Sequence, residues 1–279
     1  MGTVYGKCGF LGVLALVLLL LSLALAGTAT AVTYGLPDGA GHPFVGAVIA
    51  APPAGPAPFH GGTFTGEKMV VSSGALIAPT VFLTAGHTVA MLQEAGISDV
   101  WVCFDPVFTA QSPLIKGTMH PNPGFRMIGS TPNDVAVITL ERSVEGLNSY
   151  ASLCSAGLLD VLAANSVLRG QTFTLVGYGM QEATGGGGPW AFGPAGTRKW
   201  ATPGFSALTP ANLHMSSNHV RGYGGGSYFD SGGPLFLGNS NVIVGVEVSG
   251  DAVARALDIA CRVDTPQARD YLEHHVTLP

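Results

Sequence analysis

The stretch Tyr228-Phe229-Asp230-Ser231-Gly232-Gly233-Pro234 is the most informative part of this chain of 279 residues. Two glycines and a proline directly after Ser231 indicate a tight turn, because glycine permits backbone angles that other residues avoid and proline fixes its own. A serine at such a turn can act as a nucleophile if a neighbouring base removes its proton. Ser231 is therefore our candidate nucleophile.

Two further stretches supply the groups that such a serine needs. Leu83-Thr84-Ala85-Gly86-His87-Thr88 places a histidine at a turn, and Asn133-Asp134-Val135-Ala136-Val137-Ile138 places an aspartate before an apolar strand. The histidine can accept the serine proton, and a carboxylate behind it fixes the imidazole tautomer and stabilises the imidazolium. If His87, Asp134 and Ser231 meet in space, they form a catalytic triad.

The order of the three residues separates the folds that carry such a triad. It is histidine, aspartate, serine, with gaps of 47 and 97 residues. An α/β-hydrolase has the serine first, in the motif Gly-x-Ser-x-Gly, whereas Phe229 occupies the first glycine position here. The subtilisin order begins with the aspartate, so only the chymotrypsin order agrees with this chain.

Short stretches rich in β-branched residues, separated by glycine or proline, predict a β-rich fold. Several are apolar on both faces, as in strands of a closed or two-layered structure. A helix is predicted after Thr265, which can act as N-cap with Pro266 at the first helical position, and a shorter one after His87. The expected strands are residues 45–49, 70–73, 81–84, 135–140, 172–176 and 242–248.

The first 31 residues predict a secretory signal peptide. Lys7 is the only charge before Asp38, and residues 10–26 are almost purely apolar. Two small-x-small cleavage sites follow, Ala24-Leu25-Ala26 and Ala29-Thr30-Ala31. A retained membrane anchor is the alternative, since 17 apolar residues lie at the lower limit for spanning a bilayer. We favour cleavage because of the small-residue sites and the soluble composition downstream.

Removal of residues 1–31 would leave 248 residues with a formal charge of −6, enough for one large β domain. We expect this domain to span residues 32–279, in two halves of roughly 32–150 and 151–279. A moderately acidic chain without basic runs argues against nucleic acid or an anionic membrane as a partner.

Three cysteines would remain, and their odd number permits at most one internal disulfide. Their spacing has no metal-site pattern, so we assign no metal, and the sequence does not say which pair, if any, is bridged. They are Cys103, Cys154 and Cys261.

Together these motifs resemble those of the trypsin-like serine peptidases, close to secreted bacterial members. The stretches around His87, Asp134 and Ser231 resemble the family's histidine turn, aspartate strand and nucleophile loop. Ser73-Gly74-Ala75-Leu76-Ile77 and Val176-Gly177-Tyr178-Gly179 match as well, so the resemblance covers about the whole chain after residue 31. It implies an all-β fold of two antiparallel six-stranded β-barrels with a C-terminal helix, the triad between the barrels, and endopeptidase activity.

The resemblance further implies a secreted monomer that hydrolyses protein or peptide substrates through an acyl-enzyme, without a cofactor and without stable membrane association after signal cleavage. Its oxyanion hole would use the backbone N–H groups of Phe229 and Ser231. The family nearly always has glycine at the first position, and a Cβ there can impose strain of about 1–3 kcal/mol. The alternative is therefore a weakly active or inactive relative that acts as an extracellular binding protein.

The family often holds its histidine turn and nucleophile loop with disulfides. Ser72, Thr88 and Ser227 stand at the positions of those cysteines. We therefore expect packing and hydrogen bonds to hold these loops here.

The resemblance also locates the primary substrate pocket. Its floor position, six residues before the nucleophile, is Gly225, and Gly250 is expected on one wall. Because no carboxylate stands at position 225, we expect a neutral pocket that accepts an apolar side chain rather than arginine or lysine. Glu247 lies in an apolar strand nearby, and the sequence leaves open whether it faces solvent or lines the cleft.

In many relatives a carboxylate at the position of Asp230 pairs with a new N-terminal ammonium. Val32-Thr33-Tyr34-Gly35 resembles the family's mature start and directly follows Ala31. Our hypothesis is that cleavage after Ala31 creates the activating terminus at Val32 without a zymogen stage. The alternatives are cleavage after Ala26 and another donor for Asp230.

Overall fold

The computed structural model describes residues 32–56, 63–127, 132–181, 183–184 and 191–279. The expected signal peptide, with both of its cleavage sites, lies outside the described residues. Within the described part of the chain, no helix is long and apolar enough to cross a membrane.

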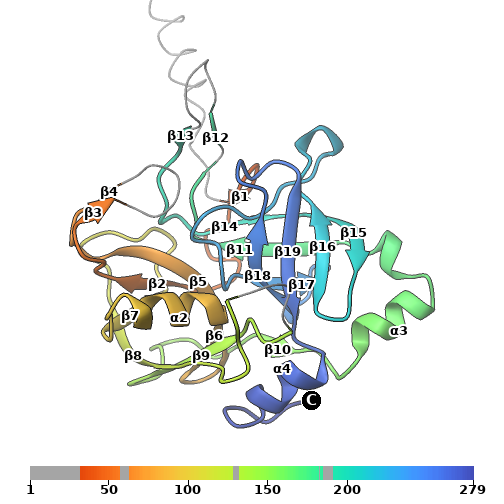
Figure 1. Ribbon diagram of the computed structural model, residues 1–279, viewed down its shortest axis with the longest axis horizontal. Helices are drawn as coiled ribbons and strands as arrows, with labels where there is room; N and C mark the ends of the chain where they lie inside the picture. Colours follow the sequence, from red (N-terminus) through yellow and green to blue (C-terminus); the bar gives the residue numbers. More distant parts are fainter. Residues whose placement is uncertain (1–31, 57–62, 128–131, 182, 185–190) are drawn as a thin grey trace, which may run out of the picture.

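Six antiparallel strands of the first half close into a barrel, drawn on the left of Figure 1. Its strand order is β2-β5-β6-β9-β8-β7. Strand β2 is buried along its whole length, because one face fills the barrel and the other is covered by neighbouring elements. The strands are β2 (Val45–Ala50), β5 (Met69–Ala78), β6 (Val81–Thr84), β7 (Val100–Cys103), β8 (Ile115–His120) and β9 (Ala136–Leu140).

The second half forms one curled sheet with the order β1-β14-β11-β17-β18-β19-β16-β15, and β10 pairs in parallel with β18. A single bridge between Thr172 and Gly204 joins the start of β11 to the start of β15, so six of these strands form a second barrel-like layer. The strands are β1 (Leu36–Pro37), β10 (Ser152–Leu153), β11 (Phe173–Gly177), β14 (Lys199–Ala201), β15 (Gly204–Leu208), β16 (Asn212–Ser216), β17 (Pro234–Leu237), β18 (Val242–Gly250) and β19 (Leu257–Arg262).

All six strands expected from the sequence are present, with ends that differ by a few residues. Two short hairpins extend from the body of the molecule in addition. The first pairs β3 (Gly55–Pro56) with β4 (Thr63–Phe64), and the second pairs β12 (Ala183–Thr184) with β13 (Ala191–Phe192).

In the ranges that the structure describes, three α-helices lie outside the two layers. Helix α2 (Gly86–Glu94) contains His87, and α4 (Pro266–Leu272) begins as expected, with the Thr265 hydroxyl accepting the Ala268 N–H at 3.3 Å. The sequence reasoning did not foresee α3 (Leu158–Ala164). Two 3-10 turns cover Leu168–Gly170 and His219–Arg221.

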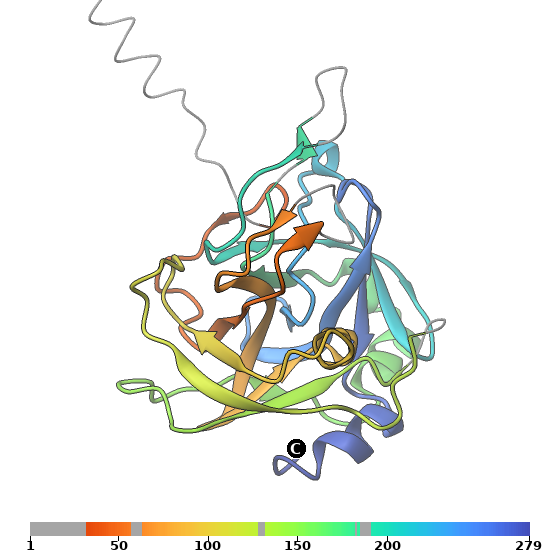
Figure 2. The same ribbon diagram turned by 60° about the vertical axis from the view of Figure 1, so that its left-hand side comes forward.

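Each half of the fold is completed by a segment from the other end of the chain. The N-terminal strand β1 pairs with β14 of the second sheet. The C-terminal helix α4 lies at the bottom of the molecule in both views (Figures 1 and 2). From there, the Tyr271 hydroxyl donates to the His120 carbonyl at 2.6 Å and accepts the Val137 N–H at 2.9 Å.

The three cysteines in the described part of the chain are buried, and no disulfide joins any two of them. The question that the sequence left open, which pair is bridged, is therefore answered for these residues: none is. The core is held by apolar packing and hydrogen bonds.

Candidate active site

His87 is the second residue of α2, and the start of this helix lies against Asp134. A Cβ at Gly86 would lie 3.2 Å from the Asn133 carbonyl oxygen, so glycine allows the close approach. The Asp134 carboxylate accepts the backbone N–H of His87 at 2.8 Å. It thereby satisfies one of the N–H groups that a helix start leaves free, and its charge is favourable there.

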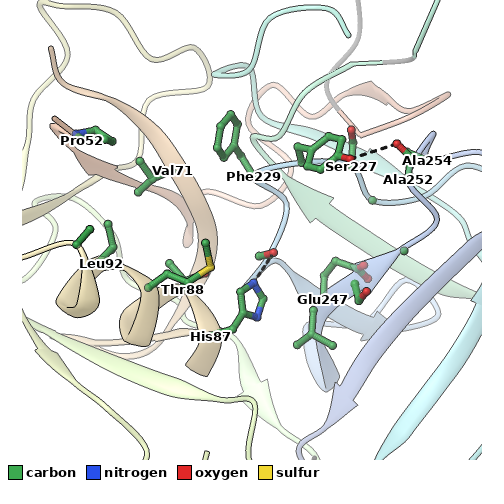
Figure 3. Close-up of a pocket in the computed structure, with 18 of the residues that line it drawn as sticks. Pro52, Val71, His87, Thr88, Leu92, Ser227, Phe229, Glu247, Ala252 and Ala254 are labelled. Carbon is green, nitrogen blue, oxygen red and sulfur yellow. Dashed lines mark hydrogen bonds between the residues drawn. The ribbon is translucent and has the colours of Figure 1, made fainter. Parts of the chain in front are cut away.

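The same carboxylate holds the imidazole ring. The Nδ1 atom of His87 lies 3.0 Å and 3.2 Å from the two Asp134 carboxylate oxygens, and Nε2 lies 2.8 Å from Ser231 Oγ. Figure 3 draws the contact between His87 and the serine as a dashed line. The three residues selected from the sequence thus meet with their functional atoms in hydrogen-bond contact. The carboxylate favours the tautomer with its proton on Nδ1, which leaves Nε2 free to accept the serine proton.

The turn that carries Ser231 depends on its glycines. The Asp230 N–H bonds to the Ser227 carbonyl at 3.0 Å, and the Gly233 N–H bonds to the Asp230 carbonyl at 2.7 Å. Gly232 has φ +86°, and a Cβ there would lie 2.2 Å from the Ser73 carbonyl oxygen. A larger residue at this position would push the nucleophile away from the first barrel.

Hydroxyl groups link the loops where relatives often have a disulfide. Ser72 Oγ lies 3.1 Å from Thr88 Oγ1 and also donates to the Ser231 carbonyl. The backbone N–H of Ser73 bonds to the same carbonyl at 2.9 Å. The expectation that hydrogen bonds replace the cross-link is met at Ser72 and Thr88. At Ser227 the hydroxyl is buried without a partner among the described residues, and the backbone N–H holds the loop instead by bonding to the Asp230 carboxylate at 3.0 Å.

Phe229 adopts the left-handed backbone conformation, with φ +72°. This is the strained geometry that a Cβ disfavours. The Ser73 hydroxyl donates to the Phe229 carbonyl at 3.0 Å and accepts the Tyr178 N–H at 2.9 Å, which fixes the strained residue. The residue is only 6% exposed, so its ring borders the cavity instead of extending into solvent.

The Asp230 carboxylate is fully buried. It accepts the N–H groups of Gly179 at 2.7 Å and Ser227 at 3.0 Å, and burial raises its pKa to about 7. Val32 is also buried, and its nitrogen is an amide in the chain as it stands. Thr33 exchanges two backbone hydrogen bonds with Gly225, at 2.7 Å and 3.1 Å, so the segment after Val32 docks beside the nucleophile loop.

A cavity of about 380 Å³ extends to both sides of the triad. Figure 3 shows Pro52, Val71 and Leu92 on one side and Glu247 on the other. Its lining is mainly apolar. The other lining residues are Phe64, His87, Thr88, Met91, Ala95, Ile97, Gly226, Ser227, Tyr228, Phe229, Ser231, Val248, Ser249, Gly250, Asp251, Ala252 and Ala254.

The substrate-pocket residues selected from the sequence are only partly at the cavity surface. Gly250 lines it, whereas Gly226, and not Gly225, forms the surface of the neighbouring wall. A Cβ on Gly225 would lie 1.7 Å from an Asp258 carboxyl oxygen, so that carboxyl group fills the space behind the wall. Glu247 lines the cavity itself. A carboxyl group therefore borders the cavity although none stands at position 225, and the preference for an apolar side chain stays a prediction.

Sequence reasoning assigned no role to three residues of this region. Ser73 entered only as part of a motif, and Asp258 was not considered. Glu247 was noticed, but β18 is buried on both faces over residues 243–247, so alternation gave no direction for its side chain. A carboxylate inside such an apolar strand was the available signal.

The two barrels and the triad between them define the chymotrypsin fold of serine proteases. The family model described as Trypsin matches residues 49–270, and the chain belongs to this family. No curated protein matches the chain.

Solved structures agree on the fold. HL collagenase is 16% identical, with a TM-score of 0.59, and the match covers 85% of this chain and 95% of that one. A mutant of human heparin binding protein is 17% identical, with a TM-score of 0.61, covering 87% and 96%. An atomic-resolution structure of HBP is 16% identical, with a TM-score of 0.62, covering 89% and 98%.

Proposed function

We propose that the protein is a secreted serine endopeptidase that cleaves proteins or peptides through an acyl-enzyme. The observation that carries the proposal is the 2.8 Å contact between His87 Nε2 and Ser231 Oγ, with Asp134 behind the imidazole. Nucleophile, base and orienting carboxylate are then already in the geometry that acyl transfer requires.

Each residue has a defined role in the proposed reaction. Ser231 Oγ attacks the substrate carbonyl carbon while its proton passes to His87 Nε2, and Asp134 stabilises the imidazolium. The proton then moves to the leaving amine, the C–N bond breaks, and an ester on Ser231 remains. A water molecule, deprotonated by His87, hydrolyses that ester and restores the serine.

The negative oxygen formed during attack needs hydrogen-bond donors. We assign this role to the backbone N–H groups of Phe229 and Ser231. Loss of one such donor typically slows turnover by about 10²–10³. The left-handed backbone of Phe229 favours a second candidate function, a binding protein with weak or no catalysis, which the experiment below separates from the first.

Secretion and activation form part of the same proposal. Cleavage after Ala31 would turn the Val32 amide nitrogen into an ammonium. Its position is supported by the burial of Val32 and by the pairing of Thr33 with Gly225, since both bring the segment to the nucleophile loop that contains Asp230. A buried ammonium beside the Asp230 carboxylate would compensate a charge that is costly to bury alone. We further propose that the released protein is a monomer, without nucleic-acid or stable membrane partners.

Labelling with a fluorophosphonate tests the proposal, because this reagent modifies only an activated serine. We expect the secreted protein to be labelled at Ser231 and to cleave a peptide library. The Ser231→Ala variant should lose both properties, with turnover reduced by about 10⁶. The matched control is Ser227→Ala, which removes a hydroxyl four residues away and should leave labelling intact.

Several outcomes would contradict the proposal. Absence of labelling in the folded protein would favour the binding protein. Sequencing of the secreted chain would exclude the activation step if the chain began at Gly27. An activity that stayed flat between about pH 5 and 9 would exclude His87 as the base.

A further inference from the structure

Residues 227–230 form a type II β-turn directly before the nucleophile. The Asp230 N–H bonds to the Ser227 carbonyl at 3.0 Å, and within the turn only the third residue, Phe229, has a positive φ, at +72°. A type II turn normally has glycine or asparagine at this position, because a Cβ is disfavoured there. A phenylalanine favours the type I turn, which accepts most residues. The local sequence and the observed turn therefore disagree.

The type of turn decides where the Phe229 N–H points. Between type I and type II, ψ of the second residue and φ of the third differ by about 150–170°, while the ends of the turn keep their places. The peptide that joins Tyr228 to Phe229 is thereby turned over. Its N–H is the donor proposed for the oxyanion hole, so a change to type I would move this donor to the opposite side of the loop.

A backbone hydrogen bond from the second half of the fold holds this peptide. The Met180 N–H, in the segment after β11, donates to the Tyr228 carbonyl at 2.7 Å. Because the N–H and C=O of a trans peptide point in opposite directions, the Phe229 N–H points away from Met180. In a type I turn the Tyr228 carbonyl would no longer face Met180, and this bond would be lost.

The Ser73 hydroxyl, from β5 of the first barrel, holds the next peptide. It donates to the Phe229 carbonyl at 3.0 Å and accepts the Tyr178 N–H at 2.9 Å. Ser73 is fully buried, and a Cβ on Gly177 would lie 3.2 Å from its oxygen, so the hydroxyl occupies space that a glycine leaves. Since the oxygen accepts from Tyr178, its own proton is directed to Phe229. With Ser73 and Met180 in place, both peptide planes beside Phe229 are held.

We propose that Ser73 is a positioning residue for the oxyanion hole, which together with the Met180 N–H keeps the strained turn in its type II form. Phe229 biases the turn toward type I, and the Ser73 hydroxyl opposes that bias. This inference rests on the proposed peptidase function. Its consequence is that the chain needs the Ser73 hydroxyl because residue 229 is phenylalanine, and a glycine at that position would make the hydroxyl dispensable.

The Phe229 N–H can be observed by itself in the whole protein. Tyr228-Phe229 is the only tyrosine–phenylalanine pair in the sequence. Labelling of tyrosine with 13C at its carbonyl and of phenylalanine with 15N therefore gives one signal in a spectrum that correlates the two atoms. We expect the amide proton of this signal to move downfield when a fluorophosphonate modifies Ser231, because the phosphonyl oxygen then accepts the Phe229 N–H.

Removal of the Ser73 hydroxyl should change that signal. In Ser73→Ala we expect it to shift or broaden before the reagent is added, and to move less afterwards, since the turn populates type I. Ser73→Cys, with a weaker donor, provides the test if the first variant does not fold. The matched control is Thr174→Val, which removes a buried hydroxyl that donates to the Gly238 carbonyl at 2.8 Å, and it should leave the signal unchanged. An unchanged signal in both Ser73 variants would overturn the proposal.

Kinetics connect the turn to catalysis. Ser73→Ala should lower kcat by about 10–100-fold and change KM by less than about threefold, because an oxyanion donor acts in the transition state. In the Phe229→Gly protein the same substitution should lower kcat by less than about threefold, since glycine adopts the type II turn without strain. Equal losses in the two proteins would show that Ser73 supports only the fold, which overturns its role in positioning.

The combined results separate this inference from the peptidase itself. Labelling of Ser231 in the parent, with the Phe229 signal and kcat unchanged in Ser73→Ala, overturns the positioning role and leaves the peptidase intact. A Phe229 signal that changes in Ser73→Ala, without labelling of the parent, supports the role of Ser73 in the turn and overturns the peptidase.

Discussion

Buried carboxyl groups occur in two regions of this molecule, and they differ in what surrounds them. Beside the first barrel, Arg198 Nε lies 2.8 Å from the Asp38 carboxylate, and His42 Nδ1 lies 2.6 Å from its other oxygen. At the cavity, Glu247 and Asp258 each have a carboxyl oxygen without a partner in the described structure. Arginine stabilises the first region, whereas no cation from the described residues forms an ion pair with Glu247 or Asp258.

The pKa values of these acids reflect both burial and partners. Burial raises the pKa of Asp38, but hydrogen bonds from His42 and Arg198 outweigh it and the net shift is downward. Glu247 is buried more deeply, which raises its pKa, and its nearest charges are further carboxyl groups, which raise it further. The fold pairs a carboxylate with a cation where the role is structural.

Removal of the cation from the paired region should have the largest effect. Arg198→Met leaves Asp38 buried without its guanidinium and also breaks hydrogen bonds to the carbonyls of Gly39 and Phe104. We expect a loss of about 3–5 kcal/mol in the free energy of unfolding, measured by urea denaturation. Arg142→Met, at an exposed position, is the control and should change stability little. Equal free energies of unfolding for the two variants would show that the Arg198–Asp38 pair does not stabilise the fold.

The Asp230 carboxylate can be studied both with and without a neighbouring cation. It has no cation while Val32 is internal, and it would gain one in a chain that begins at Val32. In a double-mutant cycle, Asp230→Asn should destabilise the chain that begins at Val32 by about 3 kcal/mol more than the chain that begins at Gly27. Additive effects of the two changes would exclude the ion pair.

The stability of the chain that begins at Gly27 should depend on pH, and the direction follows from the raised pKa of Asp230. Because burial raises the pKa of Asp230 from 3.8 to about 7, the folded state binds more protons than the unfolded state between these values. The contribution to stability is complete below pH ~4 and is lost as the pH rises to ~7. Thermal melts of the chain beginning at Gly27 should show this loss, and Asp230→Asn should reduce it.

Neutralising Glu247 should increase the free energy of unfolding, whereas the Arg198→Met substitution should decrease it. Glu247→Gln removes a group that resists ionisation in the fold, so the empty protein should gain about 2 kcal/mol above neutral pH. The gain should shrink at acid pH, where the glutamic acid is already protonated. Urea denaturation at several pH values measures it. A loss of stability at pH 8 would show that Glu247 has a structural partner.

Phe229 gives the smallest expected effect, since its strain involves no charge. Phe229→Gly and Phe229→Ala both remove the ring, but only glycine adopts φ +72° without cost. The glycine variant should therefore be the more stable of the two by about 1 kcal/mol. Fluorophosphonate labelling that is faster in the glycine variant would also tie the strain to the oxyanion hole. Equal stability would show that the strain is relieved elsewhere.

Local sequence was sufficient for most of the fold. Strand β6 coincides with the predicted residues 81–84, and Thr265 caps α4, because runs of β-branched residues and caps act over a few neighbours. Helix α3 was not predicted, since seven residues bounded by Gly157 and Asn165 give little helical periodicity. Pairing of β1 with β14 joins residues about 160 positions apart, beyond any local pattern.

Some residues of the site could likewise be predicted from local sequence, and others could not. His87, Asp134 and Ser231 were selected because each lies in a motif whose neighbours fix its position. Glu247 and Asp258 became visible only in three dimensions, because the register of β18 against β19 shifts between Glu247 and Ser249. A shift of this kind changes which side chains face the cavity, and one sequence does not specify it.

Tyr271 links the C-terminal helix to the strand that follows the candidate catalytic aspartate. Its hydroxyl binds strand β9 at Val137, three residues after Asp134, and strand β8 at His120. The C-terminal helix therefore holds the two strands that flank the aspartate of the site, and we expect loss of the Tyr271 hydroxyl to leave Asp134 less firmly held.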